Sequence, residues 1–579
     1  MLSLALLSAC GGDGAIDDPL ERYLQKEVQW KSCAGLPAGS YIEVLPASVQ
    51  ERTRCASILA PIDYAHPQNG DLSVGVMRMQ AEHTGATRRL LFLNPGGPGA
   101  DSTDVGVMLA RLWSQSTDAT ETGRLQRKLL QTYDLVAFSP RGLGSSTQLV
   151  CESDETLVPT DNSVSGRTDE NIALQFRNTE LIAQACGANP LSKHINTQQT
   201  VHDMDLIREL LGDEKFNYMG WSYGTWLGAW YGSVFPDNVG RMVLDSSVDF
   251  SLTLHDTALL QPPALTRTFD DVLAPYAARH PDIFELGDNV DVIRNILGQT
   301  QPVLQQAVSS LMYHTLFSSW DAPETLGLLL VARELNQDPF RPHLPDGVAG
   351  GNIDELRMLV GAHAFSRDEE ANIYFRELAH GVVNKIDKNV REKPVYLAGP
   401  DAVYTAVVCN DTPTPSTDPQ WWIDAETSIY QNYPMVTTDD VRSCLYWQRP
   451  ADVEKPSISA MADVQVLMLQ SEYDGATPEP HARATFAKLP KAHMIYVPGE
   501  MTHGLYPYKD ECVDLLVARY LLDQPMPGRE TTCAAHPLAK DGPPDTGLAP
   551  QAATSEASST YQDQAEAQRV VKKLKSAIR

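Results

Sequence analysis

A serine in a glycine-flanked turn constrains the fold of this chain more than any other feature. Gly220-Trp221-Ser222-Tyr223-Gly224 has the form G-x-S-x-G; an apolar run over 216–220 precedes it and a helical pattern over 223–234 follows. A strand, a sharp turn and a helix in this order hold a serine strained and exposed, with the helix N-terminus behind it to favour negative charge. The pattern predicts that Ser222 is a nucleophile; the alternative is a structural turn.

Other short apolar runs indicate buried strands that alternate with helical patterns, and they lie at 90–93, 134–138, 242–244, 464–469 and 494–497. This alternation predicts an α/β fold with a mostly parallel sheet covered on both faces. Long helical patterns without such strands fill 251–455, which predicts a helical insertion between the core segments 11–250 and 456–533. The tail 534–579 is rich in Ala, Gln, Ser and Pro and is expected to be disordered.

The N-terminus and the cysteines together indicate export. Residues 1–9 are apolar but too short to span a bilayer, and Leu7-Ser8-Ala9-Cys10 resembles a bacterial lipobox. This predicts a signal segment over 1–10 and lipidation of Cys10, although no Lys or Arg precedes the run and a frayed apolar terminus is the alternative. The other eight cysteines form four couples close in sequence, which suggests four disulfides: Cys33 with Cys55, Cys151 with Cys186, Cys409 with Cys444, and Cys512 with Cys533. The sequence alone does not establish this connectivity, and scattered buried free thiols are the alternative.

The net charge of −28 disfavours nucleic acid as a partner, because an acidic surface repels phosphate backbones.

Hydrophobic residues make up 42% and charged residues 21% of the chain, which excludes a fibrous or largely disordered protein. No couple of cysteines has the C-x-x-C spacing of a zinc or redox site. We expect no metal and no organic cofactor.

A glycine-rich loop at 94–99 follows the first predicted parallel strand. It lacks the Lys-Ser/Thr of a phosphate-binding P-loop. Backbone N–H groups of Gly97 and Tyr223 are therefore the expected oxyanion hole, and each such donor lowers the barrier by about 3 to 4 kcal/mol. The alternative is a tight turn without a catalytic role.

Two more residues complete a predicted proton relay. Asp474 follows one late strand and His503 follows the next, so the chain order is Ser, Asp, His. His503 would take the proton from Ser222 and Asp474 would orient the imidazole. Asp245 and Asp249, which follow the run 242–244, are the rival acids.

Several motifs together resemble the secreted tripeptidyl- and prolyl-aminopeptidases, which are α/β-hydrolases related to proline iminopeptidase. They are Asn-Pro-Gly-Gly-Pro-Gly at 94–99, Ser-Pro-Arg-Gly-Leu-Gly-Ser-Ser at 139–146, the serine turn at 220–224 and Asp-x-x-Thr-Pro at 474–478. The resemblance covers about 30–533 and implies an α/β-hydrolase fold with a helical cap after the sixth strand. It departs from the family at Ser139, where Asp is usual, and at Met501-Thr502, where small residues are usual.

The resemblance also implies acidic residues that hold the free amino group of a peptide substrate. Asp411 and Glu355 are candidates, and each could equally be a solvated surface carboxylate. Trp221 and Tyr223 flank the nucleophile, where they would line an apolar pocket for Pro or Ala or simply pack the turn.

The expected function is an exported serine exopeptidase, periplasmic or at the cell surface, that contacts the membrane only through the lipid on Cys10; a secreted enzyme is the alternative. It would release tripeptides or single residues from free N-termini. The alternatives are an esterase with the same triad and a non-catalytic binding protein. The sequence does not indicate an oligomeric state.

Overall fold

The computed structural model describes residues 20–33, 42–82, 88–436, 441–450, 452–538 and 541. The predictions for Cys10, for the signal segment and for nearly all of the tail lie outside these residues. The chain divides into two units, 1–534 and 535–579, and the account below concerns the first.

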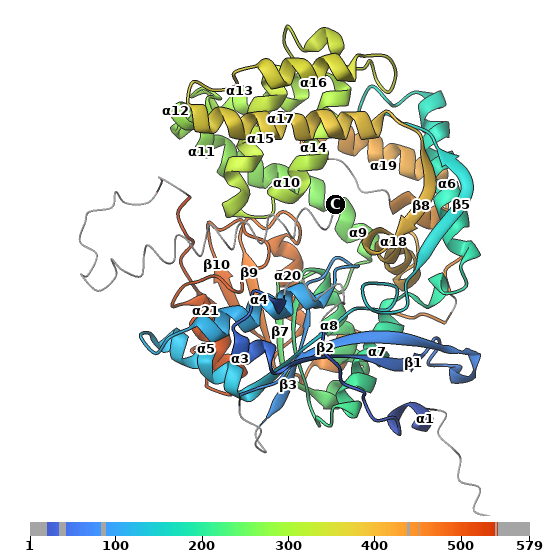
Figure 1. Ribbon diagram of the computed structural model, residues 1–579, viewed down its shortest axis with the longest axis vertical. Coiled ribbons are helices and arrows are strands. Elements are labelled where there is room, and N and C mark those ends of the chain that lie inside the picture. The colour runs from blue at the N-terminus through green and yellow to red at the C-terminus, as the bar shows by residue number, and fades with distance from the viewer. Residues whose placement is uncertain are drawn as a thin grey trace, which may run out of the picture. The chain divides into compact units, whose positions relative to one another are not determined.

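A nine-stranded sheet forms the centre of this unit, in the order β1-β2-β4-β3-β6-β7-β9-β10-β11 (Figure 1). The first two strands are antiparallel, and all later neighbours from β4 onward are parallel. The mostly parallel α/β sheet is therefore confirmed. The strands are β1 (Thr53–Pro61), β2 (Asp71–Met79), β3 (Arg89–Asn94), β4 (Tyr133–Phe138), β6 (Phe216–Trp221), β7 (Val239–Asp245), β9 (Val466–Ser471), β10 (His493–Val497) and β11 (Glu530–Thr532).

Helices cover both faces of the sheet. Gly106 on one helix lies against Ala137 of β4, whereas Gly228 on another lies against Tyr218 of β6. The strand register places Ala137 and Tyr218 on opposite faces, so these two helices do too. The core helices are α4 (Ser102–Gln115), α5 (Glu121–Thr132), α7 (Thr197–Leu210), α8 (Tyr223–Val234), α20 (Glu479–Lys488) and α21 (Val513–Leu521).

The chain leaves the sheet after β7, its sixth strand in chain order, and returns at β9. The segment between them is a helical cap, as the resemblance implied, and Figure 1 shows it above the sheet. Its main elements are α9 (Leu254–Leu259), α10 (Gln261–Thr268), α11 (Ala274–Arg279), α12 (Pro281–Phe284), α13 (Val290–Asn295), α14 (Pro302–Thr315), η6 (Ser319–Asp321), α15 (Ala322–Leu335), α16 (Ile353–Ala362), α17 (Glu369–Asn389), β8 (Lys393–Ala398), α18 (Pro400–Asp411), α19 (Pro419–Asn432) and η8 (Val441–Leu445).

The cap also takes in a stretch of the segment 11–250 that the sequence predicts to be core. Strand β5 (Val150–Leu157) pairs with β8 as a separate antiparallel sheet, and α6 (Asp169–Ala188) packs on β5, β8 and η8. Two stretches of the chain therefore build the cap, rather than 251–455 alone. The pairing joins residues more than two hundred positions apart, so no local pattern marks it.

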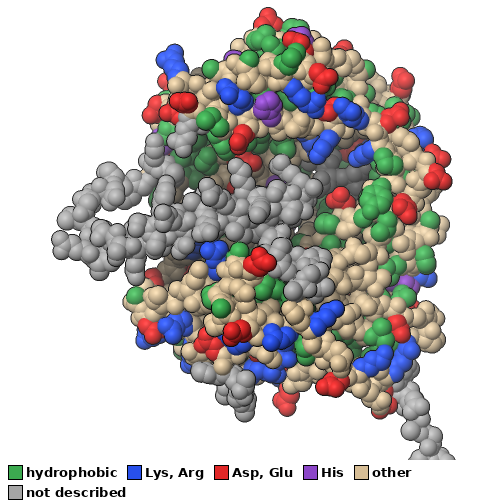
Figure 2. Space-filling model, viewed as in Figure 1, with side chains coloured by type: hydrophobic (Ala, Val, Ile, Leu, Met, Phe, Trp, Pro, Cys, Tyr) green, Lys and Arg blue, Asp and Glu red, His purple; other side chains and the backbone are tan. Residues whose placement is uncertain are grey.

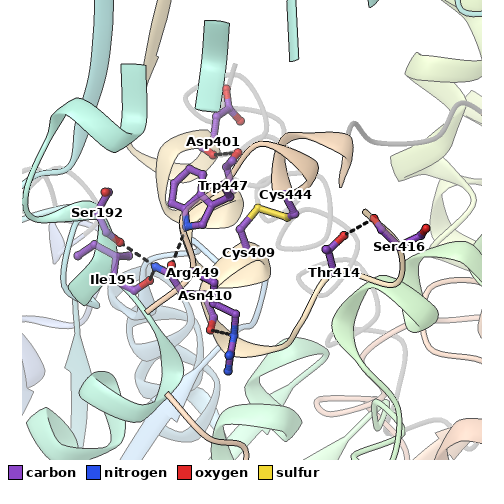
Figure 3. The surroundings of a disulfide bond; sticks show 11 residues. Ser192, Ile195, Asp401, Cys409, Asn410, Thr414, Ser416, Cys444, Trp447 and Arg449 are labelled. Atoms are coloured by element: carbon purple, nitrogen blue, oxygen red, sulfur yellow. Dashed lines mark hydrogen bonds between the residues drawn. A yellow bond between two sulfur atoms is a disulfide. The ribbon is translucent and has the colours of Figure 1, made fainter. Parts of the chain in front are cut away.

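All four couples of cysteines form disulfides, as their spacing suggested. Cys409–Cys444 joins α18 to η8 (Figure 3). Beside it, the Asn410 amide donates to the carbonyls of Ser192 and Ile195, and Trp447 Nε1 donates to Asn410 Oδ1 at 2.7 Å. This cluster fastens the end of α18 to the segment that leads into α7.

Acidic and basic side chains are interspersed over the face of the molecule seen in Figure 2. None of the helices in the described ranges has both the length and the apolar character that a bilayer crossing requires.

Candidate active site

Ser222 lies in the turn between β6 and α8, at the carboxyl edge of the sheet. Its φ of 56° is a left-handed conformation that non-glycine residues rarely adopt. The turn is held from both sides: Ser222 N donates to Asp245 O at 3.0 Å, and Thr225 N donates to Ser222 O at 2.8 Å. Strain of this kind persists only where the surroundings over-determine it, which is typical of functional sites.

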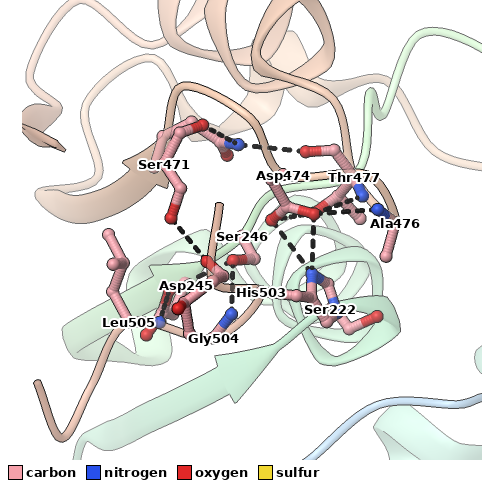
Figure 4. A network of polar contacts seen from close by, with 12 residues as sticks. Ser222, Asp245, Ser246, Ser471, Asp474, Ala476, Thr477, His503, Gly504 and Leu505 are labelled. Carbon is pink, nitrogen blue, oxygen red and sulfur yellow. Dashed lines mark hydrogen bonds and ion pairs between the residues drawn. The ribbon is translucent and has the colours of Figure 1, made fainter. Parts of the chain in front are cut away.

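Asp474 and His503 meet at the same edge, in the loops that follow β9 and β10. His503 Nδ1 lies 3.0 Å from both carboxylate oxygens of Asp474. In Figure 4 the side chains of Asp474 and Ser222 lie on either side of His503. This contact fixes the proton on Nδ1 and leaves Nε2 as the acceptor nitrogen.

The environment of His503 favours its protonated form. Burial alone would lower the pKa of this histidine, but the charge and hydrogen bond of Asp474 outweigh burial, and Asp245 adds to them, so the pKa is raised above 6.5. The side chain keeps 14% of its surface exposed. A proton acceptor with a carboxylate behind it is suited to general-base chemistry.

The rival acids have other partners. Asp245 is completely buried and accepts from the backbone N–H groups of Leu505 at 2.9 Å and Tyr506 at 2.6 Å. Burial raises the pKa of Asp245 to about 7. Asp249 accepts from the N–H and hydroxyl of Ser251. Of Asp245, Asp249 and Asp474, it is therefore Asp474 whose carboxylate contacts the His503 ring.

Thr477 is a site residue that the sequence reasoning missed. Its hydroxyl donates to Asp474 Oδ2 at 2.9 Å and lies 3.2 Å from His503 Nδ1. The backbone N–H groups of Ala476 and Thr477 donate to Asp474 Oδ1. The sequence signal for Thr477 was the Asp-x-x-Thr spacing. An Asp side chain at this spacing can accept hydrogen bonds from the backbone and hydroxyl groups of the turn that follows it.

The glycine-rich loop lies directly against the serine turn. A Cβ built on Gly96 would stand 2.5 Å from Trp221 O, 2.9 Å from Ser222 Cβ and 3.0 Å from Tyr223 N. Gly96 N donates to Asn94 Oδ1 at 3.0 Å, whereas within the described residues no partner is found for Gly97 N. Tyr223 N begins helix α8 and has no intrahelical acceptor. Among the described residues, the N–H groups of Gly97 and Tyr223 therefore remain available to an oxyanion, in a loop and a turn that touch each other.

Two family descriptions match the segments that carry these residues. The description "alpha/beta hydrolase fold" matches 89–282, which contains the glycine loop and Ser222, and "TAP-like protein" matches 428–533, which contains Asp474 and His503. The chain has an α/β-hydrolase fold. Ser222 and His503 lie in different matched segments, and most of the cap lies between these two segments in the sequence.

The chain is also similar to curated proteins over most of its length. A tripeptidyl aminopeptidase of Streptomyces coelicolor is 27% identical over 88% of this chain and 86% of its own. Serine protease Hip1 of Mycobacterium tuberculosis is 25% identical over 92% and 95%. Carboxylesterase B of Mycobacterium tuberculosis is 26% identical over 91% and 94%.

The two carboxylates expected to hold a substrate amine lie in different surroundings. Asp411 has no exposed surface; its oxygens accept from Thr197 N at 2.8 Å and from Trp226 Nε1 at 3.1 Å, and the Thr197 hydroxyl donates to it too. Burial raises the pKa of Asp411 to about 6. Glu355 lies in α16, which packs on α17 and η7 (Arg341–His343) within the cap. Asp411 is therefore a structural link from the cap to the core of the hydrolase.

Trp221 and Tyr223 pack the serine turn. Trp221 is buried and its Nε1 donates to Tyr506 O at 2.9 Å. The Tyr223 hydroxyl bonds to Thr197 Oγ1, whose proton is given to Asp411, so Tyr223 donates. These contacts fit the alternative that Trp221 and Tyr223 pack the turn. Within the described ranges, no group of three His, Cys, Asp or Glu residues is arranged to hold a metal ion.

Proposed function

We propose that this hydrolase is an exported serine exopeptidase that releases tripeptides, or single residues such as Pro or Ala, from free N-termini of peptides. The observation that carries the proposal is the contact of His503 with Asp474 at the sheet edge that also bears the strained Ser222. The names of the curated relatives, a tripeptidyl aminopeptidase and a serine protease, support peptides as substrates.

The proposed reaction proceeds through an acyl-enzyme. His503 Nε2 removes the proton of the Ser222 hydroxyl as its oxygen attacks the scissile carbonyl, and the same nitrogen then protonates the leaving amine. Asp474 holds the imidazole in the required tautomer and stabilises the imidazolium that forms. Water, activated by His503 in turn, hydrolyses the ester and frees Ser222.

The N–H groups of Gly97 and Tyr223 are proposed to receive the negative charge of the tetrahedral intermediate. Gly97 is preferred to Gly96 because Gly96 N already donates to Asn94. The N-terminus of α8 adds its dipole at the same position.

Export is supported by four disulfides, which persist in oxidising compartments. We further propose that Cys10 is lipidated and that the enzyme is held at a membrane in the periplasm or at the cell surface. Globomycin-sensitive processing, with a mass shift that Cys10→Ala abolishes, would support this; an unmodified Cys10 in the mature protein would reject it.

A substrate panel tests the proposed specificity. The enzyme should cleave tripeptide p-nitroanilides with a free amino group and leave their N-acetylated forms intact, and Ser222→Ala should abolish cleavage. Equal cleavage of both forms would reject the exopeptidase assignment.

Esterase activity is the second candidate, favoured by the similarity to carboxylesterase B. Turnover of p-nitrophenyl esters without turnover of any peptide anilide would favour it. A serine-directed phosphonate separates both from a binding protein, because failure to label Ser222 would indicate a non-catalytic scaffold.

A further inference from the structure

The cap reaches the histidine loop through the short segment 317–319, between α14 and α15. Phe317 O accepts a hydrogen bond from the backbone N–H of His503 at 2.7 Å. The two rings also lie close, with centroids 5.6 Å apart. A cap residue thus binds the main chain of the proposed general base itself.

Ser319 forms a second contact beside it. Ser319 N donates to Thr502 Oγ1 at 3.3 Å, and the two hydroxyl oxygens lie 3.0 Å apart. Because Thr502 gives its own proton to Glu500 Oε1, at 2.8 Å, the Ser319 hydroxyl is the donor of the pair. Thr502 is also where the chain departs from the small residues usual in the family it resembles.

The other N–H groups of this loop are held by the core. Met501 N and Thr502 N donate to Glu500, Gly504 N donates to Ser246, and the next two donate to Asp245. The N–H of His503 is the member of this run that donates to the cap. Movement of 317–319 away from the core would therefore leave the histidine backbone without its partner.

We propose that the segment 317–319 is a positioning element that aligns His503, so that the proton relay is complete only while the cap is seated. The inference rests on the proposed function, since it assumes that His503 serves Ser222. Phe317, Ser319 and Thr502 act through the histidine and do not themselves react.

Removal of the Thr502 hydroxyl tests the proposal. Thr502→Val keeps the shape of the side chain and loses the acceptor for Ser319, while Glu500 keeps its two backbone donors. We expect kcat to fall about three- to tenfold with KM unchanged, in line with the loss of one or two hydrogen bonds. Thr502→Ser restores the hydroxyl and should restore most of kcat.

Thr53→Val is the matched control. The Thr53 hydroxyl is buried and donates to Val49 O at 2.8 Å, and Thr53 lies in β1, the edge strand on the opposite side of the sheet from β10 and the histidine loop. This variant should lower Tm as much as Thr502→Val does and leave kcat unchanged. An equal loss of kcat in both variants would assign the effect to general destabilisation and overturn the proposal.

The rate at which a serine-directed phosphonate labels Ser222 separates the two proposals, because it reports the relay without requiring a particular peptide. Labelling of the unmodified enzyme and slower labelling of Thr502→Val support both. Equal rates in the two proteins would reject the positioning element alone. No labelling of the unmodified enzyme would reject the proposed function.

Discussion

Substitution of Gly96 by alanine should disable the site through the backbone. Gly96 has φ of +105°, where an alanine is strained by about 1 to 3 kcal/mol. The new Cβ would stand 2.5 Å from Trp221 O, and its next neighbours are Ser222 and Tyr223. Since carbon atoms rest at roughly 3.5 Å or more from such neighbours, the loop and the serine turn must separate by about 1 Å.

That displacement sets the expected magnitude. A misplacement of about 1 Å costs around a hundredfold in rate, and loss of an oxyanion donor costs about a hundred- to a thousandfold. We expect kcat of Gly96→Ala to fall by about 10² to 10³ on a free-amine tripeptide anilide.

Gly381→Ala provides the comparison. Gly381 lies inside α17, and a Cβ there meets nothing within 4 Å. This variant should keep full kcat and gain up to about 1 kcal/mol in stability, because alanine is the better helix former. If Gly96→Ala retained the kcat of the unmodified enzyme, with Tm measured in parallel, the assignment of this loop to the site would be wrong.

Three further predictions concern the proton relay and the cap. Asp474→Asn should lower kcat by about 10⁴, as loss of the correct histidine tautomer does in serine triads. Asp249→Asn should have little effect on kcat. If steady-state kinetics showed the larger loss of kcat in Asp249→Asn, the wrong acid would have been assigned. Activity should fall as pH decreases through a midpoint above 6.5, because protonated His503 cannot accept the serine proton and Asp474 raises its pKa; a kcat/KM profile with an acid limb below 6.5 would contradict this. Replacement of Cys409 and Cys444 by serine should reduce the free energy of unfolding by about 3 kcal/mol, because the loop that the disulfide closes gains freedom in the unfolded chain. Urea denaturation measures this change. An unchanged denaturation midpoint would show that the cap unfolds separately.

Features close together in the sequence could be predicted from it. The serine turn depends on five adjacent residues between a strand and a helix, and helix α8 spans the 223–234 that its pattern predicted. Each disulfide joins the two cysteines of one couple that is close in sequence. The hairpin of β1 and β2 was missed because polar residues such as Arg54, Ser73 and Arg78 interrupt its two strands.

The sequence by itself determined the strand–turn–helix at Ser222, the order of the strands that carry Asp474 and His503, and the cysteine couples, because short-range periodicity and spacing encode all three. Only the tertiary structure decided which acid meets the histidine. Asp245 ends one strand and Asp474 follows another at the same edge, but Asp245 already accepts from the amides of Leu505 and Tyr506. It also buried Asp411 and brought Phe317 to His503. Such contacts depend on how distant segments compete for the same donors and the same space, which no local pattern records.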